Sequence, residues 1–158
     1  GLCRLSHAVS LLYPSVDSDL LIAASLLHDL GKLDELECAV NIAYTTQGEM
    51  LGHISIGFQR VTRMMDKLGT PGVNDNGIAV GLRLLIEHMI LSHHGQKAYG
   101  SPVQPLFLEA ALFTNLDGVD ANVVKMTTAI EGAVPGSIWV SLPGYGKEKL
   151  FLGEKESK

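Results

Sequence analysis

An apolar run from Leu20 to Leu27 ends on the dipeptide His28-Asp29, and this junction constrains the fold more than any other feature of the chain. The uninterrupted apolar residues favour a buried helix. An imidazole and a carboxylate at the buried end of a helix are costly unless something binds them. The sequence therefore predicts a helical core that closes around a polar centre.

Other parts of the chain offer side chains of the same chemistry, at His53, at the pair His93-His94 and at Asp117. Imidazole and carboxylate together suit a divalent ion such as Mn, Fe, Zn or Mg. Helix ends and apolar helix faces that converge in a bundle core are a recurrent way to build metal sites. We therefore expect an all-α bundle with a metal centre. Its predicted ligands are His28, Asp29, His53, His93, His94 and Asp117.

Apolar residues recur at helical spacing through most of the chain. The helices predicted from this pattern cover residues 1–12, 17–30, 46–68, 78–93 and 106–129. Asp17 or Ser18 can cap the second helix, and Thr46 with Glu49 fits a capping box at the start of the third. Residues 33–43 are ambiguous, and 70–77 and 95–105 are expected to be loops.

The last part of the chain differs in character, because glycines and prolines alternate with short apolar runs at 137–141 and 150–152. We expect residues 1–158 to form a single domain, with a helical bundle over 1–131 and an irregular or short extended tail over 132–158. Trp139 is expected to anchor the tail in the core.

The charge balance limits the partners that the chain can hold. There are 12 basic and 17 acidic residues, so the formal net charge is −5. Proteins that bind nucleic acid mainly through phosphate contacts are usually basic, so any phosphate binding here must be local. Arg60, Arg63 and Lys67 recur on one face of the third helix, where a solvated face is the default interpretation and an RNA-tracking stripe the alternative. No membrane span is predicted, and two cysteines without CxxC spacing fit a reducing cytoplasm.

Residues 28–32, with the sequence HDLGK, resemble the signature of the HD-domain phosphohydrolases. Further stretches resemble the HD domain of the YhaM-type 3′–5′ exoribonucleases of Gram-positive bacteria. They are residues 48–57, residues 91–95 with 100–102, and residues 108–111 leading to 116–121. The resemblance covers nearly the whole chain and includes the spacing between the motifs.

This resemblance implies an HD-type helical bundle that removes nucleotides from the 3′ end of RNA with divalent metal, Mn especially. In that family an OB-fold domain that binds nucleic acid precedes the HD domain. A first metal-binding His is expected a few residues before Gly1, so the OB-fold and the start of the first helix are expected to be missing here. His7 does not replace this ligand, because about nine residues of helix, or ~900° of turn, separate the two positions.

Two-ion chemistry gives the motif residues their expected roles. Asp29 bridges the ions, His28 and Asp117 hold one with the upstream His, and the remaining histidines hold the other. Lys32 is expected to contact a phosphate oxygen, with a helix-terminal charge as the equal alternative. On the loop after the His pair, Lys97 and Ser101 are expected to touch the substrate.

The predicted function is metal-dependent hydrolysis of phosphodiester bonds in single-stranded RNA. Mn is the expected cofactor, with Mg, Fe, Co and Zn as alternatives, in one or two ions. The first alternative function is hydrolysis of small nucleotides or cyclic dinucleotides, which the net charge of −5 favours slightly. The second is a non-catalytic module that senses a nucleotide or a metal. The sequence leaves the oligomeric state open.

Overall fold

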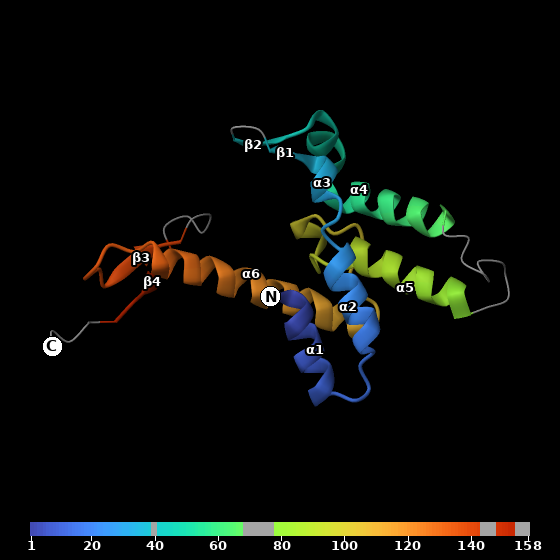
Figure 1. The fold of residues 1–158 in the computed structure, drawn as a ribbon, viewed down its shortest axis with the longest axis horizontal. Helices are drawn as coiled ribbons and strands as arrows, with labels where there is room; N and C mark the ends of the chain where they lie inside the picture. The colour runs from blue at the N-terminus through green and yellow to red at the C-terminus, as the bar shows by residue number, and fades with distance from the viewer. Residues whose placement is uncertain (39–40, 68–77, 143–147, 154–158) are drawn as a thin grey trace. The chain divides into compact units, whose positions relative to one another are not determined.

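The computed structural model describes residues 1–38, 41–67, 78–142 and 148–153, and it is mainly helical (Figure 1). The helices are α1 (Leu2–Leu12), α2 (Ser18–Leu27), α3 (Lys32–Glu35), α4 (Thr46–Lys67), α5 (Ile78–Ser92), the 3-10 turn η1 (Lys97–Tyr99) and α6 (Leu108–Glu131). The strands are β1 (Leu36–Cys38), β2 (Ile42–Tyr44), β3 (Trp139–Ser141) and β4 (Lys149–Phe151). The all-α prediction is confirmed. The predicted loop at 70–77 lies outside the described residues.

The chain divides into two compact units, residues 1–117 and residues 118–158, and α6 crosses the boundary between them. In the first unit α1 packs on α2, α2 and α4 pack on α5, and α3 packs on α4. Fully buried side chains from α2, α5 and α6 form its core. They are Leu21, Ala24, Met89, Ile90 and Phe113. The prediction of one domain over 1–158, with its bundle ending at 131, stays a prediction.

Helix α2 begins as its sequence predicts. The side chain of Asp17 accepts a hydrogen bond from the backbone N–H of Leu20 at 3.0 Å, so Asp17 rather than Ser18 is the cap. The backbone N–H of Asp17 donates to the carboxylate of Glu109 at 3.0 Å, which joins the start of α2 to the start of α6. The helix ends at Leu27, and hydrogen-bonded turns lead directly into α3.

The predicted capping box of α4 is wrong by one residue. The hydroxyl of Thr45, not Thr46, accepts from the backbone N–H of Gly48 at 2.9 Å, and the same hydroxyl donates to the carbonyl of Asp34 at 2.8 Å. This bond to α3 fixes Thr45 just outside the helix. The predicted continuous helix also bends at Gly52, which has φ 68° and ψ 154°. A second helical segment therefore starts at His53.

The ambiguous segment at 33–43 overlaps the short helix α3 and the antiparallel strands β1 and β2. Strands β1 and β2 pair Leu36 with Tyr44 and Cys38 with Ile42. In the second unit, β3 and β4 occupy the predicted extended runs and pair Trp139 with Phe151. The prediction that Trp139 is a core anchor is wrong, because its side chain is 55% exposed and its ring lies against Phe151 across the hairpin.

None of the helices in the described part of the chain combines the length and the hydropathy that a membrane span needs.

Candidate metal centre

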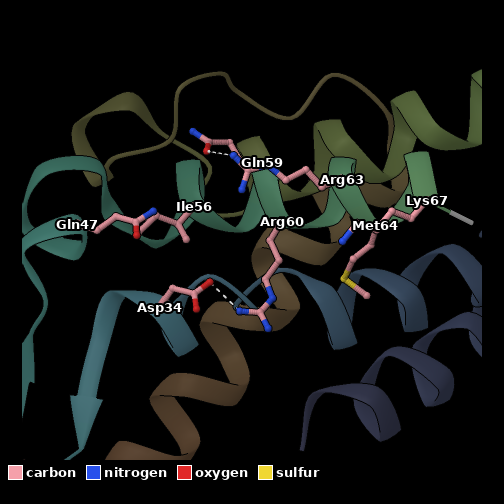
Figure 2. Close-up of a pocket in the computed structure, with 8 residues that line it drawn as sticks. All are labelled: Asp34, Gln47, Ile56, Gln59, Arg60, Arg63, Met64 and Lys67. Atoms are coloured by element: carbon pink, nitrogen blue, oxygen red, sulfur yellow. Dashed lines mark hydrogen bonds and ion pairs between the residues drawn. The ribbon is translucent and has the colours of Figure 1, made fainter.

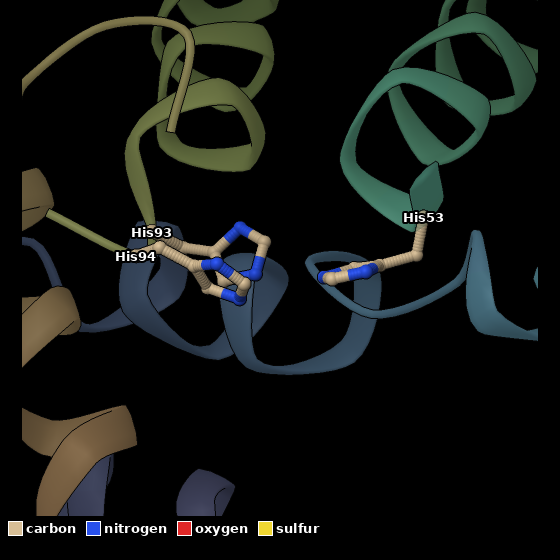
Figure 3. A group of neighbouring side chains, drawn as sticks. All are labelled: His53, His93 and His94. Carbon is tan, nitrogen blue, oxygen red and sulfur yellow. The ribbon is translucent and has the colours of Figure 1, made fainter. Parts of the chain in front are cut away.

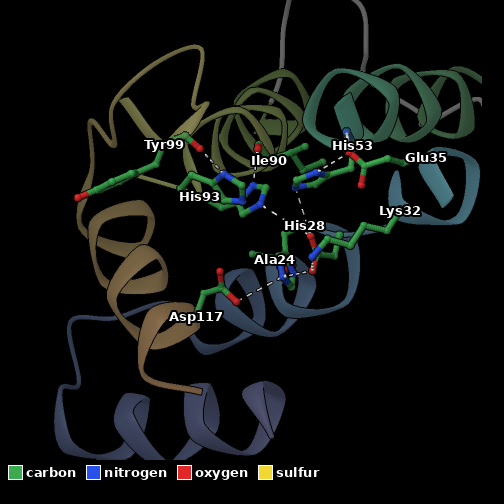
Figure 4. Close-up of polar contacts among 11 residues, drawn as sticks. Ala24, His28, Lys32, Glu35, His53, Ile90, His93, Tyr99 and Asp117 are labelled. Atoms are coloured by element: carbon green, nitrogen blue, oxygen red, sulfur yellow. Dashed lines mark hydrogen bonds and ion pairs between the residues drawn. The ribbon is translucent and has the colours of Figure 1, made fainter. Parts of the chain in front are cut away.

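The six predicted ligands come together in the first unit of the structure (Figure 4). His28 and Asp29 follow the end of α2, and His53 follows the bend in α4. The pair His93-His94 lies just past the end of α5. Asp117 lies on α6. The fold therefore places the six predicted ligands, which lie on or just past four helices, around one centre.

Each imidazole is held through its Nδ1 atom. The acceptors are the Ala24 carbonyl for His28 at 3.2 Å, the Ile90 carbonyl for His93 at 2.8 Å, the Tyr99 carbonyl for His94 at 2.7 Å and the Glu35 carboxylate for His53 at 3.2 Å. Because carbonyl and carboxylate oxygens only accept, Nδ1 carries the hydrogen in the neutral ring. In a neutral ring Nε2 then carries the lone pair that can bind a metal, as in other histidine metal sites. His28, whose Nε2 faces Asp29 and Asp117, must first lose a proton.

His53, His93 and His94 form the inner part of the centre (Figure 3). They offer ring nitrogens that all lie within 4.8 Å of one another. Oδ1 of Asp29 lies 3.6 Å from Nε2 of His53 and 3.9 Å from Nε2 of His93. Among the described residues these three atoms are buried and have no hydrogen-bond partner. Buried polar atoms without partners cost folding free energy, and a divalent ion bound between these three atoms would satisfy all of them.

The other carboxylate oxygen of Asp29 faces a second group of side chains. Oδ2 lies 3.3 Å from Nε2 of His28 and 2.6 Å from Nζ of Lys32. Nε2 of His28 in turn lies 3.5 Å from Oδ1 of Asp117. Asp29 thus stands between two sets of possible ligands with one oxygen toward each, as a bridging carboxylate requires.

The electrostatics of the metal-free centre follow from these contacts. Burial lowers the pKa of His28, but hydrogen bonds to Asp117 and Asp29 outweigh burial and raise the pKa to about 9. Burial raises the pKa of Asp29, but hydrogen bonds from His28 and Lys32 hold that pKa well below its usual range. For His93, burial lowers the pKa to about 4. At neutral pH the Asp29 carboxylate and the neutral His93 ring are therefore in the forms that bind a metal.

Glu35 holds a predicted ligand in place and was not predicted from the sequence. The residue is 7% exposed, and Oε1 accepts from the backbone N–H of His53 at 2.8 Å as well as lying 3.2 Å from Nδ1 of that residue. One carboxylate oxygen thus caps the helical segment after Gly52 and orients the His53 ring. The signal in the sequence is a single acidic residue six positions after Asp29, which resembles an ordinary surface glutamate.

A close backbone approach fixes the distance between His53 and the His28-Asp29 pair. A Cβ on Gly31 would collide with the carbonyl of His53 and would lie 2.6 Å from the nitrogen of Gly57. The backbone of α4 therefore lies directly on the turn before α3. This contact requires glycine at the fourth position of the HDLGK motif.

The predicted substrate residues lie in different environments. Lys32 pairs with Asp29, Lys97 is exposed on η1, and Ser101 is 2% exposed. A cavity of about 190 Å³ adjoins the centre. Its described lining residues are Leu51, Gly52, His53, Ile54, Ser55, His94, Tyr99 and Gly100. Neither Lys97 nor Ser101 is among them.

Two histidines lie outside the centre. His7 is exposed on α1. Nε2 of His88 accepts the backbone N–H of Leu106 at 3.1 Å, and its ring lies against Phe107. His88 therefore supports the loop before α6.

Comparison with known proteins agrees with this geometry. A family model described as HD domain matches residues 3–122. The 3′–5′ exoribonuclease YhaM of Listeria welshimeri is 40% identical over 151 residues, which are 96% of this chain and 46% of the relative. The protein of that name from Bacillus subtilis is 38% identical over 136 residues, which are 86% of this chain and 41% of the relative.

The chain spans less than half the length of these curated relatives. No solved structure matches it. The family match covers all six predicted ligands, and the structure brings their side chains together around one centre. The chain therefore belongs to the HD-domain family.

Proposed function

We propose that this chain is the catalytic domain of a metal-dependent 3′–5′ exoribonuclease. The observation that carries the proposal is the set of buried, unpartnered atoms on Asp29, His53 and His93, which a divalent ion would satisfy. The relatives named as 3′–5′ exoribonucleases support RNA as the substrate and its 3′ end as the point of attack.

The donor set fits one or two divalent ions, with Mn as the expected metal. Asp29, His53, His93 and His94 would hold one ion, and His28, Asp29 and Asp117 would contribute to another. Bound divalent ions make water a nucleophile near neutral pH and stabilise negative charge on phosphate oxygens.

The residues of the chain supply orientation and charge around this chemistry. Asp29 stays ionised and directs one oxygen to His53 and His93 and the other to His28. Lys32 lies 2.6 Å from Asp29, and this position supports its proposed role as the cation for a phosphate oxygen. Lys97 contacts the RNA from the exposed loop that carries Tyr99. Ser101 is the less accessible of the two loop residues proposed to touch the substrate, because it is 2% exposed.

The expected cellular location is the cytoplasm, in line with the free thiol of Cys3. A second candidate function is hydrolysis of small nucleotides by the same centre. The cavity of about 190 Å³ beside His53 and His94 and the net charge of −5 favour it, since a small substrate needs no long basic track.

Metal analysis and RNA trimming with Asp29→Asn test the proposal. The matched control is Asp19→Asn, which removes an exposed carboxylate from α2, the helix that ends just before His28 and Asp29. The wild type and the control should retain Mn and shorten a 5′-labelled single-stranded RNA from its 3′ end, and Asp29→Asn should do neither. Equal Mn content in Asp29→Asn and the control would contradict the site. Hydrolysis of bis-p-nitrophenyl phosphate without any trimming of RNA would favour the small-nucleotide function.

A further inference from the structure

Helix α4 carries a basic groove whose described lining contains no histidine (Figure 2). The groove has a volume of about 310 Å³. It is lined by Asp34, Gln47, Ile56, Gln59, Arg60, Arg63, Met64 and Lys67. Its lining thus combines three cations, two amides and an apolar floor with a single carboxylate.

The local charge of the groove is opposite to that of the whole chain, whose net charge is −5. The single carboxylate of the lining, Asp34, pairs with Arg60 at 2.6 Å. Asp66, next to Lys67 in sequence, is bound by Arg83 of α5 at 2.6 Å. The positive charge of Arg63 and Lys67 is therefore in excess within the groove.

The position of the cations relates the groove to the candidate metal centre. The helical segment after the bend begins at His53, and Arg60 and Lys67 follow at successive steps of seven residues. Seven residues turn a helix by ~700°, which is about 20° short of two full turns. The side chains of Arg60 and Lys67 therefore project within about 20° and 40° of the direction in which the side chain of His53 projects. They lie ~10 Å and ~21 Å farther along the axis at 1.5 Å per residue. Arg60 and Lys67 thus form a row along the face of α4 that also carries His53.

We propose that this groove binds the phosphodiester backbone of single-stranded RNA and leads its 3′ end to the histidines. The proposal rests on the proposed function. The planar guanidinium groups of Arg60 and Arg63 suit phosphate oxygens, and Lys67 adds a point charge. The amides of Gln47 and Gln59 can hydrogen-bond to ribose hydroxyls, while Ile56 and Met64 offer apolar contact to sugars or bases. A local groove of this kind lets an acidic chain hold a polyanion.

Direct binding measurements test the groove without turnover. The variant Arg63→Gln/Lys67→Gln removes two exposed charges, and the control Arg4→Gln/Lys149→Gln removes the same charge from exposed residues that do not line the groove. Fluorescence anisotropy of a 5′-labelled oligoadenylate is followed in EDTA over a salt series. The groove variant should bind at least several-fold more weakly than the control. Its slope of log affinity against log salt should be smaller by about 0.7 for each phosphate that the variant no longer neutralises.

Activity in Mn separates this proposal from the proposed function. The groove variant should raise KM for single-stranded RNA and leave the hydrolysis of bis-p-nitrophenyl phosphate and the Mn content as in the control. If the groove variant and the control bind RNA with the same affinity and salt slope, the groove proposal is wrong. The proposal is also wrong if the variant loses activity on both substrates equally. If RNA binding depends on the groove but the wild type trims no RNA, the groove stands and the proposed exoribonuclease function fails.

Discussion

At the scale of single residues, His53 differs from the other three imidazoles of the centre, because its Nδ1 is held by a side chain and not by a backbone carbonyl. Glu35 accepts both its backbone N–H and its ring N–H. Glu35→Ala should weaken Mn binding by about 10- to 100-fold, the usual cost of losing the partner of a metal-bound histidine. Calorimetric titration of the metal-free protein with Mn measures this loss. Glu37→Ala, an exposed neighbour on β1, is the control. Equal Mn affinity in the two variants would show that Glu35 does not contribute to metal binding.

His88 gives a second residue-scale prediction, on pH. Burial lowers its pKa below 6.5, and its Nε2 accepts the N–H of Leu106. A lowered folded-state pKa gives stability that is present above the unfolded pKa near 6.5 and is lost as the pH falls. Protonation breaks an acceptor bond worth about 1 kcal/mol. His88→Gln keeps an acceptor and does not titrate, so its denaturation midpoint in EDTA should fall less than that of the wild type on acidification. Parallel pH curves would contradict this.

The predictability of the site follows from the kind of contact each residue makes. The histidines and aspartates stand in motifs with recognisable spacing, so their convergence could be predicted from the sequence. Glu35 acts through a contact across 18 positions, and the Nδ1 anchors of His28 and His94 are backbone carbonyls that carry no residue signature. Such partners become visible only when the chain is folded.

At the scale of elements, the packing of α4 on the turn before α3 determines where His53 lies. Gly31→Ala would drive a Cβ into the backbone of His53 and Gly57, which cannot rotate away. We expect a loss of about 1–3 kcal/mol in unfolding free energy and weaker Mn binding. Gly81→Ala in α5, where a Cβ meets no atom within 4 Å, should instead stabilise by about 0.5–1 kcal/mol. Denaturant titration distinguishes the two signs, and a neutral Gly31→Ala would argue against the close approach.

The boundaries of these elements could be predicted less well than their existence. The helical periodicity locates α4, but two threonines stand side by side at its start. The choice of Thr45 depends on its bond to the carbonyl of Asp34, which is a tertiary contact. The bend at Gly52 likewise depends on Glu35, which receives the backbone N–H that the bend exposes.

At the scale of the whole molecule, metal binding should be measurable as folding stability. An ion that binds only the folded chain stabilises it by about 2.7 kcal/mol at a free concentration 100 times its Kd. Mn should therefore raise the melting temperature of the wild type and of Asp19→Asn, and it should leave Asp29→Asn nearly unchanged. A similar rise in all three proteins would indicate binding elsewhere.

Three of the four imidazoles are oriented by main-chain carbonyls, of Ala24, Ile90 and Tyr99, which every amino acid supplies. Substitution at those positions changes the side chain and keeps the acceptor, so most of the centre is tolerant of sequence drift in its surroundings. His53 differs, because its acceptor is the carboxylate of Glu35 and is lost with that side chain. Among the residues that orient the imidazoles, Glu35 is therefore the one whose substitution changes metal affinity most directly. A designer who wishes to adjust metal affinity without replacing a ligand should begin at Glu35.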